Sequence, residues 1–174
     1  MQELTRTDNL FNKIVEIEEA VRRVGIWRNA GLKVGFTNGV FDIIHEGHVR
    51  YLTSAADKAN RLVVAINSDE SVKRLGKGEN RPINNEKSRQ LVMAAISVAD
   101  IVIIFNEDTP LELIKTLQPD VVIKGGDYDA AERNTESKSY IVGADIMDAT
   151  GGEVATISFT DGFSTTAIIE KINQ

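Results

Sequence analysis

The sequence predicts an α/β protein, a single domain in which helices cover both faces of a parallel, five-stranded sheet. Short apolar runs alternate along the chain with longer segments whose apolar residues recur at helical spacing. The runs 61–67 and 100–105 are nearly continuous, which is typical of strands that are buried on both faces. Because parallel neighbours need a crossover helix, this alternation favours a doubly wound, Rossmann-like sheet.

Length and composition set the broad class of the protein. The 174 residues suffice for one domain with its own core, and 42% hydrophobic and 26% charged residues are ordinary proportions. Cysteine is absent, which excludes disulfides and thiolate chemistry. The net charge of −6 argues against nucleic acid, and no apolar run is as long as a membrane span. With no recognisable secretory signal, we expect a cytoplasmic protein without nucleic-acid or membrane partners.

The first 30 residues read as a segment of their own. Apolar residues from Leu10 to Val24 recur at helical spacing among charged side chains, which predicts one helix over 8–30. This helix should cover one edge of the domain or contribute to a dimer contact. We therefore expect an N-terminal helical extension, residues 1–30, followed by the main domain, residues 31–174.

The main domain shows the same two patterns in turn. They predict strands at 33–36, 61–67, 100–105, 121–124 and 154–159. They predict helices at 48–60, 86–98 and 110–117, and a last helix that Ser164 or Thr165 caps and that ends at Ile172. Residues 76–85 read as a polar loop, and residues 129–152 have no clear pattern.

The only two histidines of the chain lie three residues apart, in His45-Glu46-Gly47-His48, after the first strand and at the start of a helix. Side chains three apart on a helix share a face. A helix N-terminus offers N–H groups and a partial positive charge to anions, and ligands of doubly wound sheets bind where the strands end. His45 and His48 are therefore candidates to donate hydrogen bonds to phosphate oxygens.

Alternative roles for the histidine segment fit the residues less well. The first strand leads into Gly35-Phe36-Thr37-Asn38-Gly39, which is not the GxGxxG of dinucleotide-binding folds, and no GxxxxGK[ST] is present. The two histidines could hold a metal ion, but the spacing of a catalytic zinc site is missing. They could also be purely structural. The pattern favours a phosphate site that contains no metal ligands from the protein.

Residues 39–48 resemble the G-x-F-D-x-x-H-x-G-H signature of cytidylyltransferase-like nucleotidyltransferases. Further segments agree in order: Arg81-Pro82 before a helix with Glu86 and Arg89, Glu107-Asp108-Thr109-Pro110, Lys124-Gly125-Gly126-Asp127-Tyr128, Gly151-Gly152-Glu153-Val154, and 161–169 with Ser164-Thr165-Thr166. Over roughly residues 31–174 this set is similar to the adenylyltransferase domain of ADP-heptose synthases.

The resemblance implies an enzyme that transfers AMP from ATP, accompanied by Mg²⁺, to D-glycero-β-D-manno-heptose 1-phosphate and releases pyrophosphate. The acceptor phosphate is already a good nucleophile, so positioning and charge stabilisation carry the reaction. Relatives also suggest a homodimer. No sugar-kinase domain precedes the segment, so we expect a separate heptose kinase in the pathway. Glycerol 3-phosphate with CTP, phosphopantetheine with ATP, and nucleotide binding without turnover remain alternatives.

The candidate site follows from the strand and helix ends together with the resemblance. Lys124 ends a buried strand, where a charge needs a ligand or a partner. The resemblance adds Lys77 to His45 and His48 as a catalytic residue. It implies a nucleotide-binding set of Asn38, Gly39, Val40, Phe41, His45, His48, Lys73, Arg89, Lys124, Gly125, Asp127, Phe163, Ser164, Thr165 and Thr166.

Individual roles within this set differ. Lys73 and Lys77, expected on the polar loop, would reach the leaving phosphates, and Arg89 and Asp127 would frame the base or the ribose. The hydroxyls of 164–166 either cap the last helix or bind phosphate at its N-terminus. Asp42 either positions the acceptor or hydrogen-bonds within its own loop. The 130–140 segment looks longer than the usual connection and could reshape the acceptor pocket.

Overall fold

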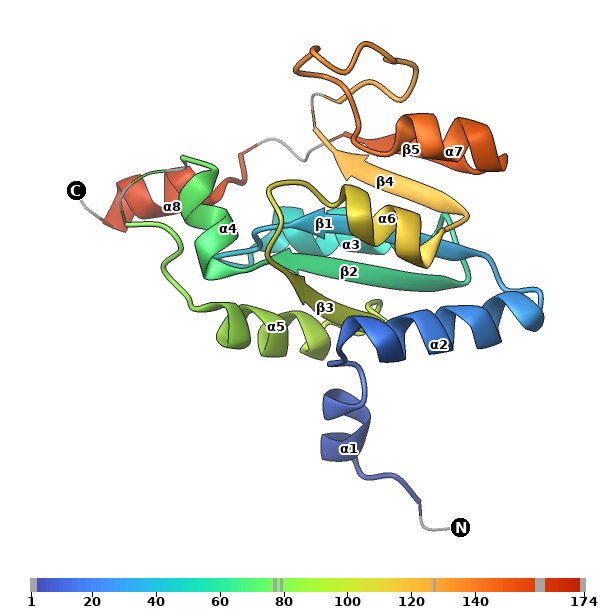
Figure 1. Cartoon of the computed structure of the whole chain (residues 1–174). Coiled ribbons are helices and arrows are strands. Elements are labelled where there is room, and N and C mark those ends of the chain that lie inside the picture. Colours follow the sequence, from blue (N-terminus) through green and yellow to red (C-terminus); the bar gives the residue numbers. More distant parts are fainter. Residues whose placement is uncertain (1–2, 77, 79, 127, 159–161, 173–174) are drawn as a thin grey trace.

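The computed structural model describes residues 3–76, 78, 80–126, 128–158 and 162–172, and it confirms the α/β prediction (Figure 1). Five parallel strands form one sheet in the order β3-β2-β1-β4-β5. The strands are β1 (Val34–Gly39), β2 (Arg61–Asn67), β3 (Ile101–Phe105), β4 (Val121–Gly125) and β5 (Glu153–Ile157). The strand order reverses between β1 and β4, so ligands are expected at the carboxyl ends of these two strands.

Helices cover both faces of the sheet and bury one apolar cluster on each. The helices are α1 (Arg6–Phe11), α2 (Ile17–Asn29), α3 (Glu46–Ala56), α4 (Asp69–Arg74), α5 (Glu86–Ala95), α6 (Leu111–Leu117), α7 (Ala144–Thr150) and α8 (Thr165–Ile172). One cluster packs α2, α6 and α7 against the sheet, and the other packs α3 and α5 against its opposite face. Burial of these apolar side chains is the main favourable term in folding.

The prediction of one helix over 8–30 was wrong, because residues 12–16 separate α1 from α2. In this break Ile14 pairs in parallel with Val102 of the edge strand β3: Val102 N donates to Lys13 O at 2.7 Å, and Val15 N donates to Val102 O at 3.3 Å. An edge strand presents unpaired N–H and C=O groups. Satisfying them outweighs the hydrogen bonds that a continuous helix would have kept.

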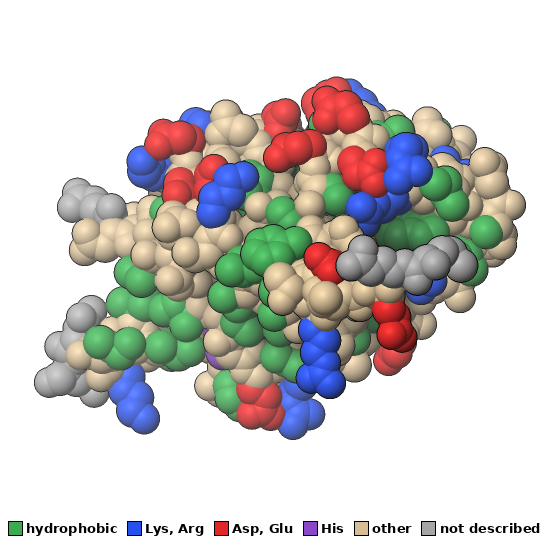
Figure 2. Space-filling model, turned by 90° about the horizontal axis from the view of Figure 1, so that it is seen from below, with side chains coloured by type: hydrophobic (Ala, Val, Ile, Leu, Met, Phe, Trp, Pro, Cys, Tyr) green, Lys and Arg blue, Asp and Glu red, His purple; other side chains and the backbone are tan. Residues whose placement is uncertain are grey.

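The two halves of the N-terminal segment pack differently. Ala20 and Val24 of α2 are buried in the core, whereas α1 buries no residue and projects from the domain (Figure 1). Phe11 of α1 and Leu91 and Val92 of α5 are among the exposed apolar side chains, and Figure 2 shows the face of the molecule on which α1 and α5 lie. Within the described residues no helix is long and apolar enough to cross a membrane.

The remaining predictions hold with shifted ends. The first strand is longer than expected and reaches Gly39, α3 covers 46–56 in place of 48–60, and α5 ends at Ala95. Pro110 precedes α6 as its N-cap residue and lies just outside the first turn. Two short helices, α4 and α7, have no counterpart among the predicted elements. The longer β1 matters for function, because it carries Asn38 and Gly39 to the edge where β4 also ends.

Candidate active site

A cavity of about 750 Å³ opens at the carboxyl ends of β1 and β4. Its volume is within the usual range for small-molecule sites. The cavity brings together many of the predicted residues: Asn38, Gly39, Val40, Phe41, Asp42, His48, Lys124, Gly125, Thr165 and Thr166. These residues come from β1, the loop before α3, β4 and the start of α8, so the sheet edge unites segments that lie far apart in the sequence.

The two histidines are stacked at the start of α3. Their ring centroids are 3.8 Å apart with 20° between the planes, and the ring of Phe41 meets His48 edge-on at 5.3 Å. His45 is the N-cap residue, and its Nδ1 accepts a hydrogen bond from His48 N at 3.4 Å. Since Nδ1 of His45 is the acceptor, the proton of its neutral ring is on Nε2. Unlike His48, His45 is not among the residues that line the cavity.

Gly47 allows this stacking. A Cβ atom at Gly47 would lie 2.9 Å from Cβ of Phe163 and 3.1 Å from both Cε1 and Nδ1 of His45. A side chain there would push the His45 ring or the 163 segment away. The glycine of the motif is therefore explained by space around the imidazole and not by an unusual backbone angle.

Both imidazoles are neutral at neutral pH. Burial, and to a lesser degree the neighbouring His45, lower the pKa of His48 to about 4. Burial also lowers the pKa of His45 below its usual value. Each neutral ring carries one N–H group that can donate a hydrogen bond, and an approaching triphosphate would raise both pKa values.

Lys124 lies where β4 ends beside β1. Its Nζ donates to Oδ1 of Asn38 at 2.6 Å and lies 5.5 Å from the centre of the Tyr128 ring. The half-buried ammonium is thus held in place at the cavity, where its positive charge suits an anionic ligand.

The Asp42 carboxylate is bound by residues of the 81–84 segment. Oδ2 accepts from Ile83 N and Oδ1 from Asn84 N, each at 2.9 Å, and Nε of Arg81 lies 2.6 Å from Oδ2. The side chain has no exposed surface. These contacts agree with the alternative in which Asp42 hydrogen-bonds within its own loop, and contact of Asp42 with the acceptor stays a prediction. The same contacts tie the loop before α3 to residues 81–84 and bring Arg81 to the cavity.

Arg89 is likewise bound by neighbouring residues. It is only 1% exposed and does not line the cavity. Its guanidinium donates to Asn84 O at 2.9 Å, Val40 O at 2.8 Å and Asp69 Oδ1 at 2.7 Å. With its donors used in this way, Arg89 supports the loops of the site. Its framing of the base or ribose stays a prediction.

Lys73 is not in the loop where it was expected. It belongs to α4, its side chain is 60% exposed, and its Nζ is 2.7 Å from Oε1 of Glu70, one helical turn away. It does not line the cavity, and a phosphate contact by Lys73 stays a prediction. Lys77 and Asp127 lie outside the described residues.

The start of α8 combines the two roles proposed for its hydroxyls. Oγ of Ser164 accepts from Ala167 N at 3.0 Å and so caps the helix, whereas Thr165 and Thr166 line the cavity. Phe163 stacks on His45 with the ring centroids 6.4 Å apart. The last helix therefore contributes both to the cavity wall and to the position of His45.

Several cavity residues carried no predicted role. They are Tyr51, Asn67, Leu75, Arg81, Asp108, Thr109, Pro110, Tyr128, Tyr140 and Val142. Arg81, the 107–110 segment and Tyr128 belong to motifs that the resemblance had singled out, which was the available signal. Tyr51 is fixed by a 2.6 Å hydrogen bond with Thr37 Oγ1 and by donation to Ile123 O at 3.1 Å, and burial raises its pKa to about 12.

The residues around the cavity offer little to a bare metal ion. No group of three or more His, Asp or Glu side chains capable of holding one occurs within the described part of the chain. Of the carboxylates at the cavity, Asp42 is buried in its own loop and Asp108 is paired with Arg74. Mg²⁺ usually binds through substrate phosphates and few protein ligands, so we treat it as part of the substrate, MgATP.

A doubly wound sheet with a histidine pair at a helix N-terminus, a lysine and helix-start hydroxyls at its switch point defines a phosphate- and nucleotide-binding α/β domain. The model of the cytidylyltransferase-like family matches residues 36–171. The chain belongs to this family.

Relatives and a solved structure agree with the resemblance. The chain is 49% identical over 160 residues to the bifunctional protein HldE of Bradyrhizobium sp. (strain ORS 278), covering 91% of this chain and 31% of the relative. It is 50% identical over 171 residues to that of Rhodopseudomonas palustris (strain HaA2), covering 98% and 32%. The chain thus spans about a third of the length of these relatives.

The solved structure is a lipopolysaccharide core biosynthesis protein from Thermoplasma volcanium GSS1. It superimposes with a TM-score of 0.60 at 26% identity, covering 75% of this chain and 100% of that one. The similarity therefore covers the whole of the solved chain and three quarters of this one.

Proposed function

We propose that this protein transfers AMP from MgATP to D-glycero-β-D-manno-heptose 1-phosphate, giving ADP-heptose and pyrophosphate. The observation that carries the proposal is the stacked, neutral histidine pair at the start of α3, of which His48 lines the same cavity as Lys124 and Thr165. The name of the solved structure, a lipopolysaccharide core biosynthesis protein, supports an acceptor that belongs to lipopolysaccharide synthesis.

The reaction is a displacement at the α-phosphorus of ATP. An oxygen of the sugar phosphate forms the new bond, the bond to the bridging β-oxygen breaks, and pyrophosphate leaves with its electron pair. A phosphate nucleophile needs no general base. The protein's task is to hold two anions in line and to stabilise the charge that develops between them.

The residues of the cavity suit this task. In the proposed reaction His45 and His48 donate N–H groups to non-bridging phosphate oxygens, and the N-terminus of α3 adds its backbone dipoles. Lys124 supplies positive charge at the end of β4, and the hydroxyls of Thr165 and Thr166 add further donors. Arg81 lies close enough to the cavity to balance the charge of the leaving pyrophosphate.

The test is release of pyrophosphate with Mg²⁺, measured for ATP, CTP and GTP against the heptose 1-phosphate and glycerol 3-phosphate. The proposal expects release only with ATP and the heptose phosphate. Release with CTP and glycerol phosphate would replace the substrates and keep the chemistry. Tight ATP binding without release from any acceptor would favour a binding module.

The histidine pair has its own test in the same assay. Replacing His48 by Ala should lower kcat/KM by about 10²–10³-fold, the usual effect of removing one donor to a developing oxyanion. The variant should fold, because the backbone hydrogen bonds of α3 remain. Near-normal turnover would contradict the role of the pair.

A further inference from the structure

Part of the cavity lining comes from two segments distant in sequence. One is the loop before α6, with Asp108, Thr109 and Pro110, and the other is the end of the 128–143 excursion, with Tyr140 and Val142. We call these five residues the acceptor wall. Ile141 is buried in the same cluster as Ile114 of α6, so the two segments share one part of the core.

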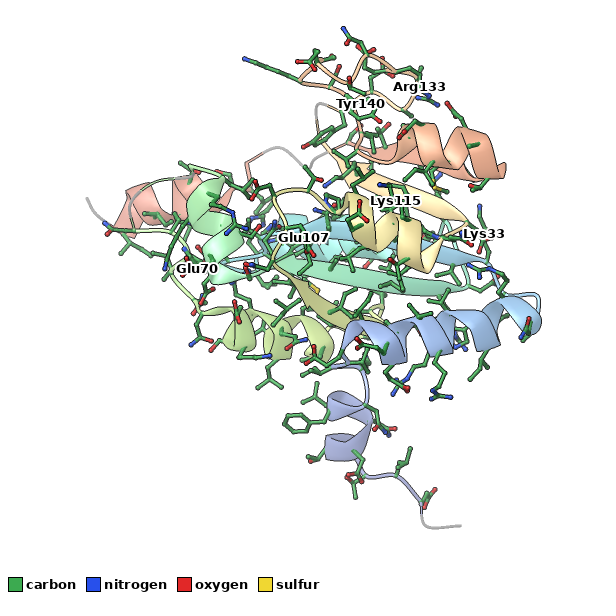
Figure 3. The ribbon with its side chains drawn as sticks, viewed as in Figure 1. Lys33, Glu70, Glu107, Lys115, Arg133 and Tyr140 are labelled. Carbon is green, nitrogen blue, oxygen red and sulfur yellow. The ribbon has the colours of Figure 1, made fainter. Side chains whose placement is uncertain are left out.

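Gly143 allows this junction. Its φ is 93°, and a Cβ atom there would lie only 2.7 Å from Cδ1 of Ile114. Both facts require glycine at this position. The excursion is also tied to α7, since Nε and Nη2 of Arg133 pair with the two carboxylate oxygens of Asp148 at 2.6 and 2.9 Å. Figure 3 shows Arg133 and Tyr140 on the excursion above β4.

The loop before α6 is anchored just as firmly to α4. Oγ of Ser71 donates to Glu107 O at 2.9 Å, and Oγ of Ser68 donates to Asn106 Oδ1 at 2.6 Å. Nε of Arg74 donates to Oδ1 of Asp108 at 2.5 Å, and its Nη2 also bonds to Asn106 O. The Asp108 side chain is nevertheless 70% exposed. Its carboxylate is oriented without being buried, and one of its oxygens is held by Arg74.

The residues that line the cavity include two sets that differ in chemistry. His48, Lys124, Arg81, Thr165 and Thr166 offer donors and positive charge, which suits phosphates. The acceptor wall instead offers a carboxylate, a tyrosine and the apolar surfaces of Pro110 and Val142. A carboxylate accepts hydrogen bonds from hydroxyl groups and repels a phosphate. An aromatic side chain offers both an apolar face and a polar end.

We propose that the acceptor wall binds the carbon skeleton of the acceptor, with Asp108 accepting hydrogen bonds from its hydroxyl groups and Tyr140 packing against its C–H surface. This inference rests on the proposed function and specifies which residues select a polyhydroxylated acceptor. Arg74 acts as a positioning residue for Asp108. Tyr140 is itself held, because its hydroxyl donates to Oδ1 of Asp145 at 3.0 Å.

Steady-state kinetics of Asp108→Asn separates acceptor binding from the rest of the reaction. The substitution removes the carboxylate charge that accepts the hydrogen bonds. The KM for heptose 1-phosphate should therefore rise by about 10–100-fold, as expected for the loss of hydrogen bonds to a charged group. The KM for ATP and the melting temperature should not change. Glu112→Gln is the matched control, because Glu112 is on α6, pairs with Lys115 at 2.8 Å and lies outside the cavity lining.

Tyr140 is tested by a pair of variants. Tyr140→Ala removes the ring and should raise the KM for the acceptor, whereas Tyr140→Phe keeps the ring and should restore most of the affinity. Wild-type turnover of the heptose phosphate is established first, and its absence would contradict the proposed function together with this inference. Wild-type turnover with an unchanged acceptor KM in Asp108→Asn and Tyr140→Ala would overturn this inference alone.

Discussion

The rings of His45 and His48 stack 3.8 Å apart at the first turn of α3, and Nδ1 of His45 accepts the backbone N–H of His48. The motif therefore does more than place two side chains on one face of a helix. One imidazole caps the helix, fixes its own tautomer and covers the other, which lowers the pKa of the second ring. Two neutral donors are thus prepared before any phosphate arrives.

The tight packing around Gly47 predicts that a single added methyl group lowers activity at this position. Gly47→Ala places Cβ within 3.1 Å of the His45 ring and 2.9 Å of Phe163 Cβ, so kcat/KM should fall at least about tenfold as the donor geometry is lost. Gly25→Ala is the control: nothing lies within 4 Å of that position in α2, and the change should stabilise by about 0.5–1 kcal/mol. Full activity in Gly47→Ala would show that His45 can move freely.

The lowered pKa values predict the charge of the free site. His48 should stay neutral until the pH approaches 4, and His45 should titrate below 6.5. Bound MgATP should raise both values, so binding near pH 6 takes up protons. NMR titration can follow both rings separately, because the chain has only two histidines. A His48 pKa of 6.5 or more in the free protein would contradict the burial of its ring.

The same shifts have a consequence for stability. Because the unfolded chain binds protons near pH 6.5 while the folded His48 resists them to about pH 4, stability should decrease as the pH falls through this interval. Thermal melts of the wild type and of His48→Ala at pH 7 and pH 5 measure this loss. A larger decrease in the variant than in the wild type would contradict it.

Two lysines should behave in opposite ways. Lys124→Met removes the charge at the end of β4 and should lower kcat/KM by about 10²-fold, since an electrostatic donor to the phosphates is lost. Lys73→Met removes a charge that pairs with Glu70 outside the cavity and should leave turnover unchanged. Assays of both variants at one salt concentration decide the point. A strong loss with Lys73→Met would restore the role that the sequence suggested.

Arg89 should prove structural. Arg89→Lys keeps the charge but cannot reproduce the three-way hydrogen bonding to Val40 O, Asn84 O and Asp69, and it should cost about 1.5–3 kcal/mol of unfolding free energy. Denaturant unfolding measures this. Arg22→Ala, which breaks an exposed ion pair, is the control and should leave the midpoint unchanged. An Arg89 variant of full stability that binds ATP weakly would instead indicate a direct contact.

The strands β2 and β3 were predictable because each is a nearly continuous apolar run, which is typical of a strand that is buried on both faces. The break at 12–16 was not, because the apolar spacing of a helix continues through it and the deciding factor is the open edge of β3. The short helix α4 was also missed. It has only six residues, and its stability comes from the Ser68 cap and from packing, not from a long amphipathic pattern.

The site also contains residues that the sequence could place and residues that it could not. Residues next to a predicted strand end, such as Asn38, His48 and Lys124, line the cavity as expected because their position follows from local pattern and strand order. Asp108 and Tyr140 come from loops that meet only through the packing of α6 against the excursion, which no local pattern shows. Lys73 and Arg89 do not line the cavity, because a nearby carboxylate or carbonyl binds each of them.

The most direct measurement is ³¹P NMR of the wild-type protein with MgATP and D-glycero-β-D-manno-heptose 1-phosphate. The expected result is the loss of the sugar monophosphate signal in step with the appearance of a coupled diphosphate pair and of pyrophosphate. With His48→Ala the sugar monophosphate signal should persist over the same time. Unchanged spectra for the wild type, or orthophosphate without a new diphosphate, would contradict adenylyl transfer to this sugar.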